Sequence, residues 1–234
     1  SVRDGIPRPA VEKEYSGCMK QTEEIDCELT ALVEKDYYSD ESELDHVLRR
    51  YFEGLEPAER ESFKQVVLKR LAREVSTVNI LLAGVSAFPE VVPVLASVLN
   101  AESKTSQITR ALMNVLCHYN DDAAFKAVAR FLDSEQELEA LTCLCGMNFL
   151  KALPHIKTAV RRDHLFDACL QIFYNRKKAV GLDGLQTDLR ALMFDNPSQV
   201  RDRLRKVFLC KRGKYNPFTP EEIVEILAGF EFGN

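Results

Sequence analysis

The sequence predicts an all-α fold in which short antiparallel helix pairs stack in order as an α-solenoid. Apolar residues recur with a helical period along nearly the whole 234-residue chain, and no stretch sustains the period-two alternation of a strand. Short polar turns join helices of roughly 10 to 16 residues. Three blocks starting at Val92, Phe125 and Leu153 align their apolar positions at spacings of 33 and 28 residues, within the range of helical repeats. A compact orthogonal bundle is the alternative, because helical stripes align easily.

The chain before the repeats divides into an expected arm and an expected cap. Residues 1–20 contain Pro7 and Pro9 and show no periodicity, so we expect a flexible arm there. A helix is expected over 44–52, with Ser42 as its N-cap, and Pro57 suits the first turn of the next helix.

Residues 21–75 are thus expected to form an N-terminal helical cap on the stack. The end of a solenoid must present a polar outer face. Glu56, Glu59, Arg60, Glu61 and Lys64 are expected to supply it.

Residues 76–209 are expected to form the repeats. Each aligned block ends in a polar turn and leads into a second apolar helix, expected over 108–117, 138–145 and 165–173. Residues 210–234 are expected to form a linker and a C-terminal capping helix. Thr219 before Pro220, with Glu222 third in the helix, has the pattern of a capping box. The sequence thus predicts a flexible arm over 1–20 followed by a single all-α domain over 21–234.

A resemblance to a known family rests on one block of the repeat. Ala152-Leu153-Pro154-His155-Ile156, the polar turn Arg161-Arg162-Asp163 and the helix around Ala168-Cys169-Leu170 resemble a HEAT-like repeat of the armadillo/HEAT type. The resemblance covers residues 76–176 well and 182–209 weakly. The turns lack the family's Asp followed by Val-Arg, and proline appears in two of the three blocks. The family implies a curved stack of helix pairs whose concave face binds another macromolecule.

Composition and motifs exclude several classes of function. No apolar run approaches the roughly 18 residues of a membrane helix, and seven cysteines, several within apolar helical stretches, favour a reducing compartment, so a cytoplasmic location is expected. Cys143 and Cys145 point about 200° apart on a helix and cannot share a metal ion. The four histidines fall in no metal or catalytic motif. We therefore expect no metal, no cofactor and no catalytic residue.

Charge is segregated along the chain. Residues 151–214 hold 15 Lys and Arg against 6 Asp and Glu, a net charge of +9, whereas residues 1–150 carry −10 and the last twenty carry −4. Some HEAT-like proteins are DNA glycosylases with a tryptophan-lined basic concavity, but this chain has no Trp, so that activity is not carried over. The candidate binding residues are Arg161, Arg162, Arg176, Lys177, Lys178, Arg201, Arg203, Arg205, Lys211, Arg212 and Lys214. Lys206 belongs to the same basic stretch as Arg201, Arg203 and Arg205.

Two functions from different classes follow from these patterns. The first is a non-enzymatic scaffold or adaptor that binds a protein partner in the groove of the stack. The alternative is a nucleic-acid- or polyanion-binding protein that uses residues 161–214 without reading base sequence. Arg201 and Arg205 are expected opposite the stripe of Leu204 and Phe208. The same cations could instead solvate helix faces, balance helix dipoles or pair with the acidic N-terminal half.

Overall fold

The structure, a computed structural model, describes residues 20–34, 41–101, 105–192, 197–210 and 216–230. These residues form twelve α-helices and two short 3₁₀ helices, and no strand occurs among them. The all-α prediction is therefore confirmed for the described part of the chain. The helices are α1 (Thr22–Val33), α2 (Glu41–Glu53), α3 (Pro57–Arg73), α4 (Thr77–Ser86), η1 (Pro89–Val91), α5 (Val92–Asn100), α6 (Ser106–Leu116), α7 (Asp122–Ala129), α8 (Glu137–Met147), α9 (Phe149–Ala159), η2 (Asp163–Leu165), α10 (Phe166–Arg190), α11 (Pro197–Leu209) and α12 (Pro220–Ala228).

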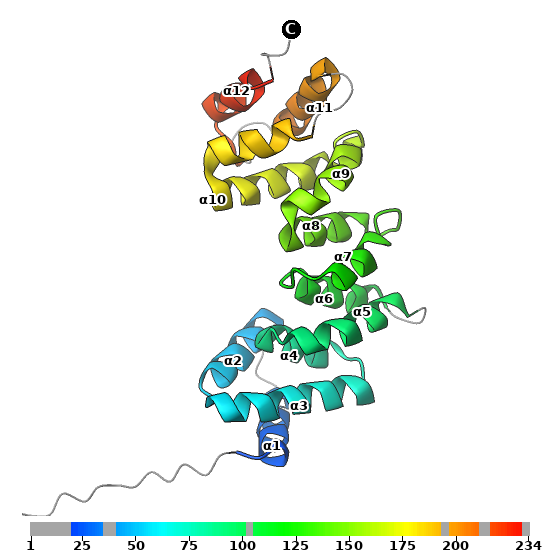
Figure 1. Cartoon of the computed structure of the whole chain (residues 1–234), viewed down its shortest axis with the longest axis vertical. Helices are drawn as coiled ribbons and strands as arrows, with labels where there is room; N and C mark the ends of the chain where they lie inside the picture. The colour runs from blue at the N-terminus through cyan, green and yellow to red at the C-terminus, as the bar shows by residue number, and fades with distance from the viewer. Residues whose placement is uncertain (1–19, 35–40, 102–104, 193–196, 211–215, 231–234) are drawn as a thin grey trace, which may run out of the picture.

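From α4 to α12 the helices follow one another along the long axis broadly in the order of the sequence, while α3 lies between α1 and α2 (Figure 1). Contacts join each helix to others close to it in the chain: α4 packs on α6, α6 on α8 and α8 on α10, while α5 packs on α7. In Figure 1, α6 and α8 lie to the right of α2 and α10, so that the molecule is bowed with its hollow side to the left. We call the face of α4, α6, α8 and α10 the inner side, and the face of α5, α7, α9 and α11 the outer side.

Local signals in the sequence account for several helix ends. Pro57 is the first residue of α3, and Thr219 forms a capping box with Glu222 at the start of α12. The expected N-cap at Ser42 is wrong, because α2 begins one residue earlier at Glu41. Glu59 is buried rather than on the polar outer face. Its carboxylate accepts hydrogen bonds from the backbone N–H of Glu56 and of Lys20, which ties residue 20 to the start of α3.

Apolar side chains form one continuous core along the stack. Phe63, Phe173 and Phe208 are among its largest fully buried members, and they lie in α3, α10 and α11. Buried polar side chains among the described residues form hydrogen bonds. For example, the Tyr119 hydroxyl donates to the carbonyl oxygen of Ala83 at 3.1 Å and links the segment after α6 to α4. Each layer of the stack is thus held by burial against the next layer.

Helix α10 is two helices joined by a kink at Gly181. This residue has φ +78° and ψ 177°, a combination that essentially only glycine adopts. Arg176 Nε donates to Asp188 Oδ2 at 2.7 Å, and this bond joins the two segments of α10 across the kink. Both side chains of this pair are largely buried, which favours a defined bend over a flexible joint.

Helix α12 packs on both segments of α10 and on α11. Glu222 of α12 accepts hydrogen bonds from Lys177 before the kink, at 2.9 Å. Gln186, after the kink, donates to the carbonyl oxygen of Glu225 at 2.9 Å. Phe218, just before α12, is buried and packs edge-on against Phe208, with ring centroids 5.0 Å apart. The C-terminal helix therefore packs on its own chain and stabilises the kink by contacting α10 on both sides of it.

The kink generates a prediction about two glycines. We expect Gly181→Ala to lower the free energy of unfolding by about 1–3 kcal/mol, because alanine is strained at this φ and ψ. The matched control is Gly146→Ala in α8, where a Cβ would meet Cys117 Cβ at an ordinary 3.6 Å. That change should raise stability by up to about 1 kcal/mol through helix propensity. Urea unfolding of both variants measures the two values, and equal effects would contradict the assigned backbone at 181.

The packing of α12 generates a second prediction. Ile226 is fully buried whereas Val224 on the same helix is 68% exposed. Ile226→Ala should cost about 2–4 kcal/mol and lower the melting temperature by roughly 5–10 °C. Val224→Ala should leave it within about 1 °C. Thermal unfolding followed by circular dichroism checks both, and an unchanged melt for Ile226→Ala would mean that α12 is not docked in solution.

Candidate partner-binding surfaces

Eight of the eleven candidate cations lie among the described residues, and the structure distributes them over several places. Lys211, Arg212 and Lys214 lie outside the described residues. Of the rest, Arg161 and Arg203 line a hollow between α9 and α11. Arg176, Lys177 and Lys178 lie on α10, and Arg201 and Arg205 are exposed on α11. Arg162 belongs to a separate polar network.

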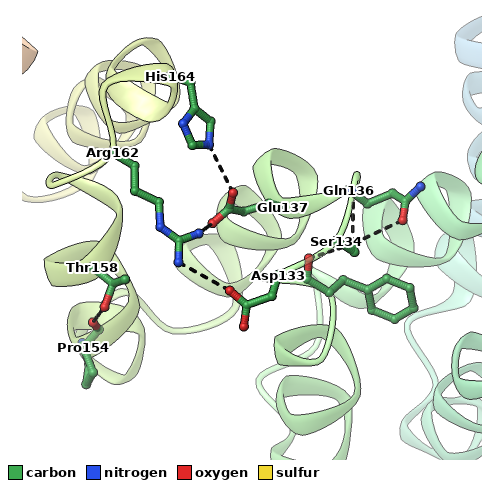
Figure 2. A network of polar contacts seen from close by, with 9 residues as sticks. Asp133, Ser134, Gln136, Glu137, Pro154, Thr158, Arg162 and His164 are labelled. Carbon is green, nitrogen blue, oxygen red and sulfur yellow. Dashed lines mark hydrogen bonds and ion pairs between the residues drawn. The ribbon is translucent and has the colours of Figure 1, made fainter.

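Arg162 is engaged by two carboxylates (Figure 2). Its guanidinium reaches from the turn after α9 to Glu137 at the start of α8 and to Asp133 at 3.3 Å. His164 Nε2 lies 3.3 Å from the other oxygen of Glu137. Beneath this network lies a hollow of about 280 Å³ with apolar walls that include Leu141 and Leu165. Arg162 thus links the turn after α9 to the previous helix pair.

The cations of α10 also face acids and aromatic rings. Besides its bond to Asp188, Arg176 stacks over the ring of Phe149 at 4.9 Å. Lys177 pairs with Glu222 at 2.9 Å and lowers the pKa of that carboxyl below its usual value. Lys178 is exposed, with its ammonium 4.4 Å from the centre of the Tyr174 ring. Lys177 thus joins α10 to α12, whereas Arg176 joins the two segments of α10 and Lys178 contacts a ring of its own helix.

The exposed cations of α11 flank its buried stripe. Arg201 and Arg205 are exposed, as expected, while Leu204 and Phe208 are fully buried. Three residues turn a helix by roughly 300°, so Arg201 projects about 60° from Leu204. The expectation that these arginines lie directly opposite the stripe is therefore wrong. The residues of α11 that face the end of α9 are Gln199, Asp202, Arg203 and Lys206.

The hollow between α9 and α11 has a volume of about 550 Å³ and is open to solvent. We call it the α9–α11 hollow; its lining residues are Arg161, Gln199, Asp202, Arg203 and Lys206. The four from α11 recur at three- and four-residue spacing and so share one face of that helix. Arg203 Nη1 also donates to Asp163 Oδ1 at 3.0 Å. Three cations and one acid therefore line this surface.

The inner side presents a different surface, made of parallel exposed stripes. Sequence reasoning did not single these residues out, because isolated polar residues at helical spacing carry no chemical signature. A hollow of about 220 Å³ lies between α8 and α10, with Phe149 and Ile172 at its base and Arg176 beside it. The exposed stripes are Gln107, Arg110 and Asn114 on α6, Leu138, Thr142 and Gly146 on α8, and Asp167, Gln171 and Asn175 on α10.

The described residues assemble neither a metal site nor an activated cysteine. No group of three or more His, Cys, Asp or Glu side chains there could hold a metal ion. His155 packs against Phe125, and burial lowers its pKa. Cys145 lies in the inner hollow, but burial raises the pKa of its thiol, which opposes a role as a nucleophile.

Comparison with protein-family models, curated proteins and solved structures returns no match to this chain. A search of the described helices finds none with the length and apolar character needed to cross a bilayer.

The burial of the thiols generates a prediction about labelling. Cys143 and Cys169 are buried, and burial raises the pKa of Cys169 to about 12. Cys27 and Cys210 are exposed. We expect iodoacetamide at pH 8 to label the exposed pair in native protein and the buried pair only after unfolding, as read by peptide mass spectrometry. The polar sequence around Cys18 predicts that it is the most reactive thiol, but this residue lies outside the described residues. Fast native labelling of Cys169 would contradict the assigned face of α10.

Proposed function

We propose that this protein is a non-enzymatic scaffold that binds a protein partner along the inner side of a HEAT-like α-solenoid. Support for the solenoid comes from the contacts of alternate helices, α4 with α6, α6 with α8 and α8 with α10. The first residues of these four helices follow one another at intervals of 29 to 31 residues, near the spacings of 33 and 28 between the aligned sequence blocks. Such a stack offers a long surface built from successive helices rather than one enclosed pocket.

One observation carries the choice of the inner side. The exposed stripes of α6, α8 and α10 lie on successive helices that pack directly on one another, so they form a continuous strip. Seven of the nine residues of the strip are uncharged, and its Arg110 pairs with Glu139 at 2.9 Å. The hollow of about 220 Å³ within it has an apolar base and a polar rim. That combination suits one anchoring side chain of a partner surrounded by hydrogen-bonding groups.

Engagement of the cations weighs against the alternative of a nucleic-acid-binding protein. Arg162, Arg176 and Lys177 each face a carboxylate and contribute to helix packing. A polynucleotide needs a run of accessible cations to neutralise successive phosphates. The described part of the basic segment offers such cations in one short stretch, around the α9–α11 hollow.

The proposal is tested by filling the inner hollow. Thr142 is exposed at the hollow, and its hydroxyl donates only within α8, to the carbonyl oxygen of Leu138. Thr142→Arg should therefore leave the fold intact and reduce capture of a protein partner at least tenfold. The matched control is Thr158→Arg on α9, because Thr158 is also exposed and donates within its own helix, to the carbonyl oxygen of Pro154.

The measurement is affinity capture on immobilised full-length protein from a nuclease-treated cell lysate, quantified by mass spectrometry. Partners that persist after nuclease, are lost with Thr142→Arg and are kept with Thr158→Arg would support the proposal. Loss of all partners on nuclease treatment would favour the nucleic-acid alternative. Equal capture by the two variants would overturn the assignment to the inner side.

A further inference from the structure

The α9–α11 hollow carries a concentration of donors on the opposite side of the molecule from the inner strip. Arg161 follows the end of α9, and Arg203 and Lys206 project from α11 (Figure 1 shows both helices on the outer side). Gln199 adds an uncharged amide to the same wall. Against these groups the lining has one carboxylate, that of Asp202. The surface therefore favours a negatively charged ligand.

Arg203 retains donors for such a ligand. A guanidinium has five N–H groups, and the bond to Asp163 uses one donor nitrogen, Nη1. Asp163 is 76% exposed, and an ion pair at this level of exposure contributes little stability, about 0–1 kcal/mol. Lys206 is exposed and makes no ion pair within the described residues. A planar carboxylate can thus be bound by Arg203 and a second one by Lys206.

The neighbouring acids discriminate between classes of anion. Asp202 lies in the wall of the hollow, and Asp163 lies beside Arg203. A nucleic-acid backbone carries a charge at every nucleotide and would meet these carboxylates as it left the hollow. A peptide places its acids at chosen positions and can put a neutral or basic residue against Asp202. The mixed charge of the surface therefore fits a protein segment better than a polynucleotide.

We propose that the α9–α11 hollow is a second docking site, which binds an acidic segment of a partner protein through Arg203 and Lys206. Charge complementarity and an open volume of about 550 Å³ carry this assignment. That volume accommodates two or three side chains and not a folded domain. The site lies on the outer side and stands independently of binding along the inner strip.

A fluorescein-labelled peptide of eight glutamates, titrated by anisotropy against the full chain at 50 and 200 mM salt, tests the proposal. We expect binding at 50 mM salt that weakens at 200 mM. Lys206→Glu should weaken it about tenfold. The matched control is Arg205→Glu, which makes the same charge change on the same helix outside the hollow and should weaken binding less than threefold.

Three outcomes would overturn the proposal. One is the absence of binding by the unmodified protein at 50 mM salt. Another is an equal loss with both variants, which would indicate attraction by the overall charge of α11 and no defined site. The third is tighter, Lys206-dependent binding of a labelled single-stranded or duplex oligonucleotide than of the peptide. Thr142→Arg, which fills the inner hollow, should leave peptide affinity unchanged, so failure here and failure of the scaffold proposal are separable.

Discussion

Every helix of this chain buries its apolar stripe against helices that are near it in the sequence, and the rest of the structure depends on this constraint. Helices that pack on such near neighbours need no central core shared by all of them, so each group of helices stabilises the next. The two ends would then expose apolar surface. At one end α1 packs on α3, and at the other α12 packs on α10 and α11. The contacts of α12 on both sides of Gly181 show how the terminal layer also fixes the bend beneath it.

Ion pairs at the surface also join helices that are close to one another in the sequence. Arg110 pairs with Glu139, Lys151 with Asp122 and Arg162 with Glu137, and each pair joins one layer to another layer close to it in the chain. Exposed pairs of this kind contribute little stability one by one, but they favour one lateral alignment of the helices. The net charge of +9 over residues 151–214 is therefore partly offset where the cations lie, by acids outside that segment such as Glu137 and Glu222.

Sequence predicted the helices well because their signals are local. The capping box at Thr219 and the first-turn proline at Pro57 depend on a few adjacent residues. The kink at Gly181 was not predicted, because the residues around it keep a helical pattern and the bend depends on Arg176 reaching Asp188 twelve residues away. The same limit applies to the candidate sites. Clustered Lys and Arg are visible in a sequence, but whether Arg162 faces solvent or Glu137 is decided by another helix.

The bow of the stack explains why the two proposed surfaces differ. When a stack of helices bends, the helices on its inner side come together and those on its outer side spread. On the inner side, α6, α8 and α10 pack directly on one another and leave a nearly continuous strip, with the hollow of about 220 Å³ between α8 and α10. On the outer side α5 also packs directly on α7, but further along the chain α7 and α9 meet through side chains such as Phe125 and His155, with a hollow beside them, and a larger hollow separates α9 from α11. The close packing of α6, α8 and α10 and the wider spacing of α9 and α11 thus produce two surfaces of different shape and charge.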